Sequence, residues 1–160
     1  MGATLLWFAA GLEIGGAFGE VGHPDVEHGV VTELDVAVTP HLAARGFWRL
    51  QGFGHGDAVE GSVTDFAVGA RLDLFDATHS TRPFVALVLG DSLTFVRPKS
   101  APETSFNSFA ALASGGVDFA LLSHFGLRLE ARAKFSSGGP CCESPGATDL
   151  SGSFLLFLGF

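Results

Sequence analysis

Apolar and polar residues alternate with a period of two along almost the whole chain, and the spacing of an amphipathic helix is hard to find. The alternation is clearest over residues 126–135, where Leu, Ala and Phe alternate with Arg, Glu and Lys. A period of two indicates strands, because successive side chains of a strand point to opposite faces of its sheet. Eight strands are predicted, near residues 3–19, 29–39, 43–55, 61–75, 83–96, 107–121, 126–135 and 149–160.

The connectors between these segments alternate in length. Longer, polar connectors are expected near residues 20–28, 56–61, 97–106 and 136–148, and shorter ones near 40–42, 76–82 and 122–125. Tight turns at one end and looser loops at the other are typical of an up-and-down barrel. The sequence therefore predicts one domain over residues 1–160, an all-β, eight-stranded antiparallel barrel with both termini at the short-turn end.

The composition favours a membrane environment for this barrel. Charged residues make up only 16% of the chain and hydrophobic residues 47%, whereas a soluble domain usually carries about 25% charged residues. No stretch reaches the roughly 18 apolar residues that a membrane helix needs. A closed barrel is then the remaining way to cross a bilayer, because it pairs every backbone group between strands.

The polar face of the predicted strands combines small residues with nearly balanced charge. Gly and Ala are frequent on it, and the interior of an eight-stranded barrel has room for few large side chains. Seven acids oppose six bases, as a sealed interior requires, since buried charges must be paired. We therefore expect the apolar face to meet lipid and an ion network to close the lumen, formed by Glu13, Glu33, Asp35, Arg45, Arg49, Asp65, Arg71, Asp73, Asp118, Arg128, Glu130, Arg132 and Lys134.

One acid, Asp91, breaks this pattern. It falls on the face that carries Val85, Leu87 and Leu89. The position indicates either the rim of the barrel or a bulge that shifts the phase of the strand.

A family resemblance is clearest near the C-terminus, from about residue 114 onward. The pair Asp118-Phe119 is followed by Gly126-Leu-Arg-Leu-Glu-Ala-Arg132, and the last strand ends in a stripe of Phe154, Leu156, Leu158 and Phe160. These features resemble the OmpA/OmpX-type outer membrane β-barrel domain family, and Val38-Thr-Pro-His41 resembles its periplasmic turns. The resemblance implies a place in the bacterial outer membrane, membrane lipid or lipopolysaccharide as a partner, and a role for the final stripe in membrane insertion.

Two features depart from that family. Tyr is absent, although such barrels usually carry Tyr in their aromatic girdles, so Trp7, Trp48 and several Phe are expected to anchor the barrel at the interfaces. The N-terminus has no basic leader or cleavage site, so we expect a mature chain from which a signal peptide has been removed. A redesigned barrel would fit both departures as well.

Two other functions stay open. A soluble barrel would use the Leu/Phe face as its core and bind a small ligand. A lipid-modifying enzyme would need a Ser/His/carboxylate arrangement, but Ser123 and His124 are strand neighbours that point to opposite faces. No catalytic residue, cofactor or metal site is predicted. The net charge of −8 and the absence of a basic stripe argue against a nucleic-acid partner.

The long connectors carry the remaining features of interest. Cys141 and Cys142 are adjacent, and in an oxidising exterior we expect a disulfide between them or with another chain. The surplus acids lie mostly in or beside these connectors, as a contact surface for cations, lipopolysaccharide or another protein. In the first connector, acids and imidazoles could gather a divalent cation: Glu20, His23, Asp25, Glu27 and His28.

Overall fold

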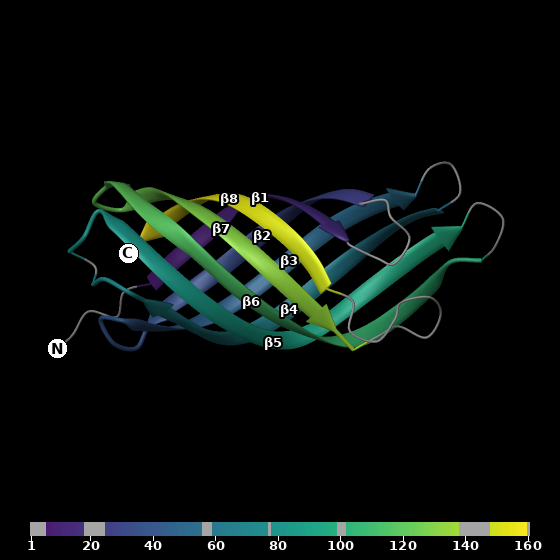
Figure 1. Cartoon of the computed structure of the whole chain (residues 1–160), viewed down its shortest axis with the longest axis horizontal. Helices are drawn as coiled ribbons and strands as arrows, with labels where there is room; N and C mark the ends of the chain where they lie inside the picture. Colours follow the sequence, from purple (N-terminus) through teal and green to yellow (C-terminus); the bar gives the residue numbers. More distant parts are fainter. Residues whose placement is uncertain are drawn as a thin grey trace.

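Eight antiparallel strands form a closed barrel in the computed structural model, which describes residues 6–17, 25–55, 59–76, 78–98, 102–137 and 148–159. Each strand pairs with the next one in the chain, and β8 pairs with β1 to close the sheet (Figure 1). The predicted fold is therefore confirmed. The strands are β1 (Leu6–Ala17), β2 (Asp25–Ala37), β3 (Leu42–His55), β4 (Val59–Asp73), β5 (Thr81–Pro98), β6 (Thr104–Leu122), β7 (Phe125–Ser136) and β8 (Thr148–Gly159). Within the described residues, no helix is long and apolar enough to cross a membrane.

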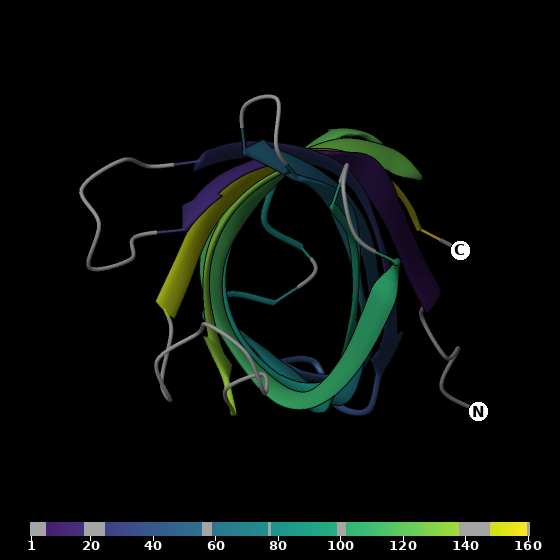
Figure 2. The ribbon, with the colours of Figure 1, turned by 90° about the vertical axis from the view of Figure 1, so that its right-hand side faces the viewer.

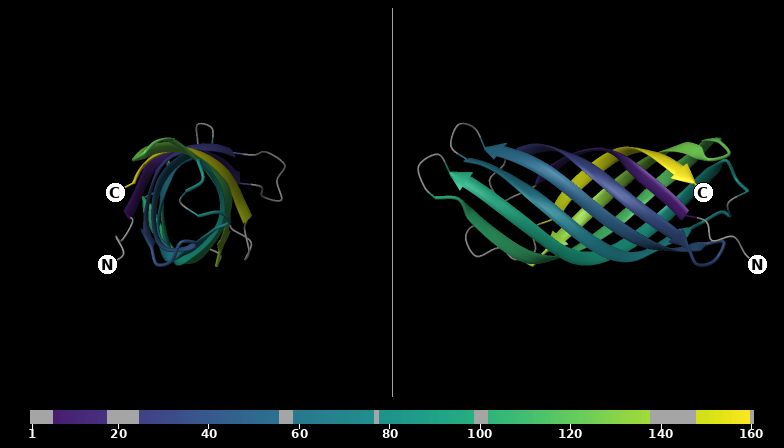
Figure 3. Two further views of the ribbon diagram at one scale, coloured as in Figure 1. Left: turned by 90° about the vertical axis from the view of Figure 1, so that its left-hand side faces the viewer. Right: turned by 180° about the vertical axis from the view of Figure 1, so that it is seen from behind.

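The two ends of the barrel differ, as the connector lengths predict. The connectors β2–β3 (38–41), β4–β5 (74–80) and β6–β7 (123–124) lie at one end, where β1 begins and β8 ends (Figures 1 and 3). Trp7 pairs with Gly159 at this end. We call it the short-turn end, and the opposite end the loop end.

Local hydrogen bonds explain why the chain reverses at residues 38–41. The backbone amide of Val38 donates to the carbonyl of Leu42 at 2.8 Å. The Thr39 hydroxyl oxygen accepts from the amides of His41 (3.3 Å) and Leu42 (3.0 Å). A Thr side chain that binds amides two and three residues ahead is a local turn device, and Pro40 presets its own φ.

The connector between β4 and β5 lies across the short-turn mouth. Its described residues fall within the outline of the barrel in both axial views (Figures 2 and 3). The amide of Leu74 donates to the carbonyl of Pro83 at 2.9 Å, and the amide of Ala120 donates to the carbonyl of Ser80 at 2.7 Å. The connector is thus bonded to the start of β5 and to the end of β6.

Glycine allows β4 and β5 to approach closely on the lumen side. A Cβ on Gly69 would lie 2.0 Å from the carbonyl oxygen of Leu87, and one on Gly90 would lie 1.9 Å from that of Phe66. Both distances are far below van der Waals contact, so no other residue fits without a shift of the backbone. Glycines of this kind let a sheet curve sharply, which suits the oval cross-section in Figure 2.

The strand that carries Asp91 keeps its phase. The register of β5 runs unbroken through Asp91 against both neighbours, with Phe66 and Phe109 as its partners. The bulge alternative is therefore wrong, and Asp91 points outward. In the described ladders, a register shift occurs between Ala120 and Leu122, beside the β6–β7 turn.

Candidate functional site

The inward faces of β2 to β7 bring ionisable side chains together in the lumen. Among the described side chains they comprise seven bases and six acids, and all are buried except Asp73, which is partly exposed. The bases are Arg45, Arg49, Arg71, Arg82, Arg128, Arg132 and Lys134, and the acids are Glu33, Asp35, Asp65, Asp73, Asp118 and Glu130. Alternation along each strand brings them to the same side: on β7 they occupy every second position from Arg128 to Lys134, and on β3 and β4 they share the inward positions with Ala, Phe and Gly.

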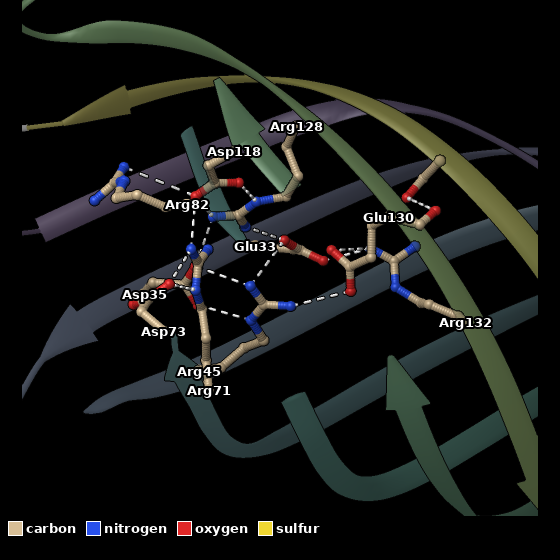
Figure 4. Close-up of polar contacts among 11 residues, drawn as sticks. Glu33, Asp35, Arg45, Arg71, Asp73, Arg82, Asp118, Arg128, Glu130 and Arg132 are labelled. Carbon is tan, nitrogen blue, oxygen red and sulfur yellow. Dashed lines mark hydrogen bonds and ion pairs between the residues drawn. The ribbon is translucent and has the colours of Figure 1, made fainter. Parts of the chain in front are cut away.

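Glu33 and Glu130 are held by the same two arginines (Figure 4). Arg45 donates to Glu130 Oε1 at 3.1 Å, and its Nη2 lies 3.6 Å from Glu33 Oε2. Arg132 donates to Glu33, and its Nη2 lies 3.2 Å from Glu130 Oε2. Two carboxylates that would repel each other are thus joined by two shared guanidinium groups, whose planar fork suits such contacts.

Asp35 and Asp118 form a second group of the same design. Arg71 reaches Asp35 Oδ2 at 3.1 Å and Asp118 Oδ2 at 2.6 Å. Arg128 reaches Asp35 Oδ2 at 3.0 Å and donates from Nε to Asp118 Oδ1 at 2.7 Å. The two groups are linked, because Arg45 donates to Asp35 at 2.8 Å and Arg128 donates to Glu33.

The ring of Phe84 lies at the centre of this network. The guanidinium carbon of Arg71 is 4.0 Å from the ring centroid, and those of Arg45 and Arg128 are each 5.0 Å away. Attraction between a cation and an aromatic face is stronger where water is excluded. The ring also covers Gly116, whose added Cβ would lie 2.8 Å from Phe84 Cζ. Phe84 therefore fills the space between the arginines and the wall.

Arg82 is a member of the network that the sequence analysis missed. Its Nη2 lies 3.8 Å from Asp118 Oδ2, and its side chain is buried. The sequence pattern places this residue in the connector 76–82, whereas β5 begins at Thr81. The parity it shares with Phe84 and Ala86, both inward, was the available signal.

A further set of contacts surrounds Asp65, nearer the loop end. Arg49 donates from Nε to Asp65 Oδ2 at 2.7 Å, and Lys134 donates to Asp65 Oδ1 at 3.0 Å. Lys134 also donates to the hydroxyl of Ser92 at 2.8 Å. Asp65 thus faces two bases, and the Lys134 ammonium has a neutral acceptor as well.

Apolar side chains fill the lumen between these polar contacts. Arg132 places its guanidinium carbon 4.9 Å from the centroid of Phe47. The buried apolar cluster comprises Ala9, Val31, Phe47, Ala67, Val88, Ala110, Leu112, Leu155 and Phe157. Charged and apolar side chains together occupy the centre of the barrel.

The outward faces carry the large apolar residues. Exposure of these side chains reaches 71% at Val68 and 57% at Phe66, while Arg49 on a neighbouring strand is 2% exposed. The stripe of β8 follows the same rule, because Phe154, Leu156 and Leu158 are exposed and Leu155 and Phe157 are buried. Large hydrophobic residues therefore form a belt around the outside, and the charged side chains of the network lie within.

The β4–β5 connector, at the short-turn end, holds one carboxylate with several hydrogen-bond partners. Asp76 Oδ1 accepts from the Thr78 hydroxyl and from the Thr78 amide at 3.0 Å, and it lies 3.0 Å from His79 Nδ1. These hydrogen bonds, with the Thr78 hydroxyl foremost, lower the pKa of Asp76 to about 2. The His79 ring stacks on Phe75 with centroids 5.1 Å apart, so the connector has internal order.

Several predicted residues lie outside the described part of the structure. These are Cys141, Cys142 and Phe160, together with the side chain of Glu13, whose backbone belongs to β1. Residues 20–24 of the predicted first connector lie outside the described part too. The prediction that Asp25, Glu27 and His28 belong to this connector is wrong, because they lie in β2, and their side chains are not described. Among the residues that are described, no group of three or more His, Cys, Asp or Glu side chains could hold a metal ion.

Comparison with known proteins gives matches in structure alone. No family model and no curated protein sequence matches the chain. Neisserial surface protein A is 13% identical with a TM-score of 0.73, over 96% of this chain and 95% of that one. The outer membrane protein OprG from Pseudomonas aeruginosa is 9% identical with a TM-score of 0.69, over 99% and 96%. The outer membrane enzyme PagL is 16% identical with a TM-score of 0.53, over 96% and 98%.

The chain has the fold of small outer-membrane β-barrels. At these identities the likeness concerns the fold. It agrees with the resemblance drawn from Asp118-Phe119 and the Gly126–Arg132 segment.

Proposed function

We propose that this protein is a structural or surface-interaction barrel of the bacterial outer membrane, with a lumen closed by its ion network and with no catalytic role. The observation that carries the proposal is the sidedness of the strands. Arg128 and Glu33 are buried in the lumen, while Leu87, Phe66 and Phe109 are exposed on the outside. In a soluble barrel the apolar face of the strands would form the core and the charged face would contact water. The exposed apolar belt therefore favours a barrel surrounded by lipid.

The filled lumen supports a closed barrel rather than a channel. Eight strands leave an interior just wide enough for side chains, and Arg49, Arg128, Phe84 and Leu112 are all 2% exposed or less. The β4–β5 connector also lies across the short-turn mouth (Figure 2). The protein should therefore give no discrete conductance steps when inserted into a planar bilayer.

The contact surface is expected at the loop end. Acids gather in or beside the long connectors, including Glu20, Asp57 and Glu143. An acidic surface attracts cations and basic partners, with a strong dependence on ionic strength. Cations, lipopolysaccharide or another protein are the proposed partners there.

The decisive experiment tests whether the folded chain needs a bilayer. The protein is refolded into lipid vesicles, detergent micelles or plain buffer, then run in SDS with and without boiling. Insertion predicts a folded band that shifts on boiling only for the lipid and detergent samples, with the strands protected from protease in vesicles. A monomer that stays folded in plain buffer would establish the soluble alternative. Hydrolysis of a lipopolysaccharide substrate by inserted protein would establish an enzyme.

A further inference from the structure

A row of outward side chains on β3 to β6 places one carboxylate among aromatic rings. Trp48, Phe66, Asp91 and Phe109 are successive register partners across these four strands. The rings of Trp48 and Phe66 lie with centroids 6.4 Å apart. Directly opposed residues on one face bring their Cβ atoms within about 5.5 Å of each other, so Asp91 has a Phe on each side.

The row lies at the border of the apolar belt. Toward the short-turn end the next outward partners are Val68, Leu89 and Ala111. Toward the loop end the next outward row is Thr64, Leu93 and Asn107, so the belt becomes polar on β4 and β6. Aromatic side chains at such a border mark the level of the lipid headgroups. These flanking rows contain no basic residue that would neutralise Asp91.

A groove opens beside this row on the outer wall. It has a volume of about 450 Å³, and Asp91, Trp48 and Phe66 are among the residues that line it. Gly46 provides its floor, because an added Cβ there would meet nothing closer than 3.9 Å. The register partners of Gly46 are Leu34 and Val68, so the sides of the groove are apolar.

We infer that this outer-wall site binds an amine-headed lipid, with its ammonium group at Asp91 and an acyl chain in the groove over Gly46. A carboxylate accepts strong hydrogen bonds from an ammonium group, and aromatic faces attract the same cation. An anionic headgroup would be repelled by Asp91. The inference rests on the membrane position proposed above, and it adds a preferred lipid to that function.

The fluorescence of Trp48 can report which lipid occupies the site. The chain has two Trp residues, so Trp7→Phe leaves Trp48 as the single emitter. The variant is placed in phosphatidylglycerol vesicles that contain increasing fractions of lipid with brominated acyl chains, which quench Trp on contact. Brominated phosphatidylethanolamine should reach half-maximal quenching at a mole fraction about threefold lower than brominated phosphatidylglycerol, as expected for an ammonium ion among aromatic rings.

Two variants and one matched control locate the effect. Asp91→Asn should make the two lipids equal quenchers, and Gly46→Leu should fill the groove and weaken quenching by phosphatidylethanolamine. The control moves the reporter to a second outer groove, of about 650 Å³, which Gly152 and Phe154 line. The one charged residue among those that line this groove, Glu130, is buried on the lumen side. Phe154→Trp in a chain without Trp7 and Trp48 should therefore show no preference between headgroups.

Each alternative result has a distinct meaning. Equal quenching by both lipids at Trp48, or a preference that survives Asp91→Asn, would overturn the inference. So would a preference for the anionic lipid that requires Ca²⁺ and disappears with EDTA, because the carboxylate would then hold a metal bridge. Loss of quenching at high protein-to-lipid ratio would mean that a second copy covers the site. No quenching by any lipid would instead contradict the proposed position of the barrel in a membrane.

Discussion

The inner and outer faces of the same strands follow opposite rules. On β7 the inward residues Arg128, Glu130 and Arg132 are buried, while the outward residues Leu129 and Phe135 are 48% and 47% exposed. The inner face is stabilised by pairing, because a buried charge without a partner is costly. The outer face is suited to a solvent that offers no hydrogen bonds. The comparison shows that the alternation of the sequence defines two faces of each strand. Which face forms the interior depends on the medium around the barrel.

Removing one shared guanidinium should produce the largest effect. Arg128→Met leaves Asp118 and Glu33 without a guanidinium group that contacts both of them directly. The expected loss is about 3–5 kcal/mol of unfolding free energy, because the carboxylates stay buried with too few partners. Urea titration of the protein in lipid vesicles measures it.

The matched control lies at the rim of the same barrel. Arg97 pairs with Glu103 at 3.1 Å, and their side chains are 71% and 49% exposed. Arg97→Met should cost less than about 1 kcal/mol, as exposed pairs do. Equal losses in the two variants would contradict a sealed network.

Placing a charge on the outer face should cost somewhat less. Leu87 is 54% exposed within the belt on β5, and Leu87→Arg is expected to lower the unfolding free energy by about 2–4 kcal/mol in a bilayer. Leu122, beside the β6–β7 turn, serves as the control, because Leu122→Arg near the interface should cost about 0–1 kcal/mol. If Leu87→Arg proved harmless in vesicles, the apolar belt would not face lipid.

The sequence predicted the faces because a strand repeats every two residues, whatever its partners are. Leu129 and Arg128 could be sorted by parity alone. Parity does not give register, so it could not show that Glu33 of β2 and Glu130 of β7 share Arg45 and Arg132 across the lumen. That grouping depends on how the strands stagger and on the size of the closed ring.

Three individual residues show where parity was misread or insufficient. Arg82 was missed because the start of β5 was placed two residues too late, which left an inward base in a connector. Asp91 was sorted to the apolar face correctly, but only the unbroken register showed that it stays there without a bulge. The inward ring of Phe84 was equally hidden, since its role depends on Gly116 across the ladder.

Glycines on the inner and outer faces allow the packing of the two faces to be compared by Gly→Ala substitutions, each of which adds one methyl group. A Cβ on the inward Gly126 would lie 2.2 Å from Phe157 Cζ and 2.4 Å from the carbonyl oxygen of Phe119. Gly126→Ala should therefore cost about 1–3 kcal/mol, the range for overpacking. On the outward Gly152 a Cβ would meet nothing within 4 Å, so Gly152→Ala should be neutral or slightly stabilising. Thermal unfolding of both variants measures this difference in stability. A similar loss of stability in both variants would mean that the outer groove is not open.

The smallest expected effect concerns Asp76, a hydrogen-bonded carboxylate that belongs to neither face. Its pKa of about 2 lies below the ordinary value of 3.8, so its contribution to stability is present above that ordinary value and is lost as the pH falls through 2. Above about pH 4, the free energy of unfolding of wild type should exceed that of Asp76→Asn by a small, constant margin. This margin should vanish near pH 2. Paired unfolding curves from pH 5 to pH 2 measure this difference, and ¹³C NMR of the carboxyl gives the midpoint directly. Thr78→Val should raise that midpoint toward 3.8, because it removes the hydroxyl that donates to Asp76. A midpoint unchanged in Thr78→Val would show that the connector owes its order to the stacked Phe75 and His79 rings instead.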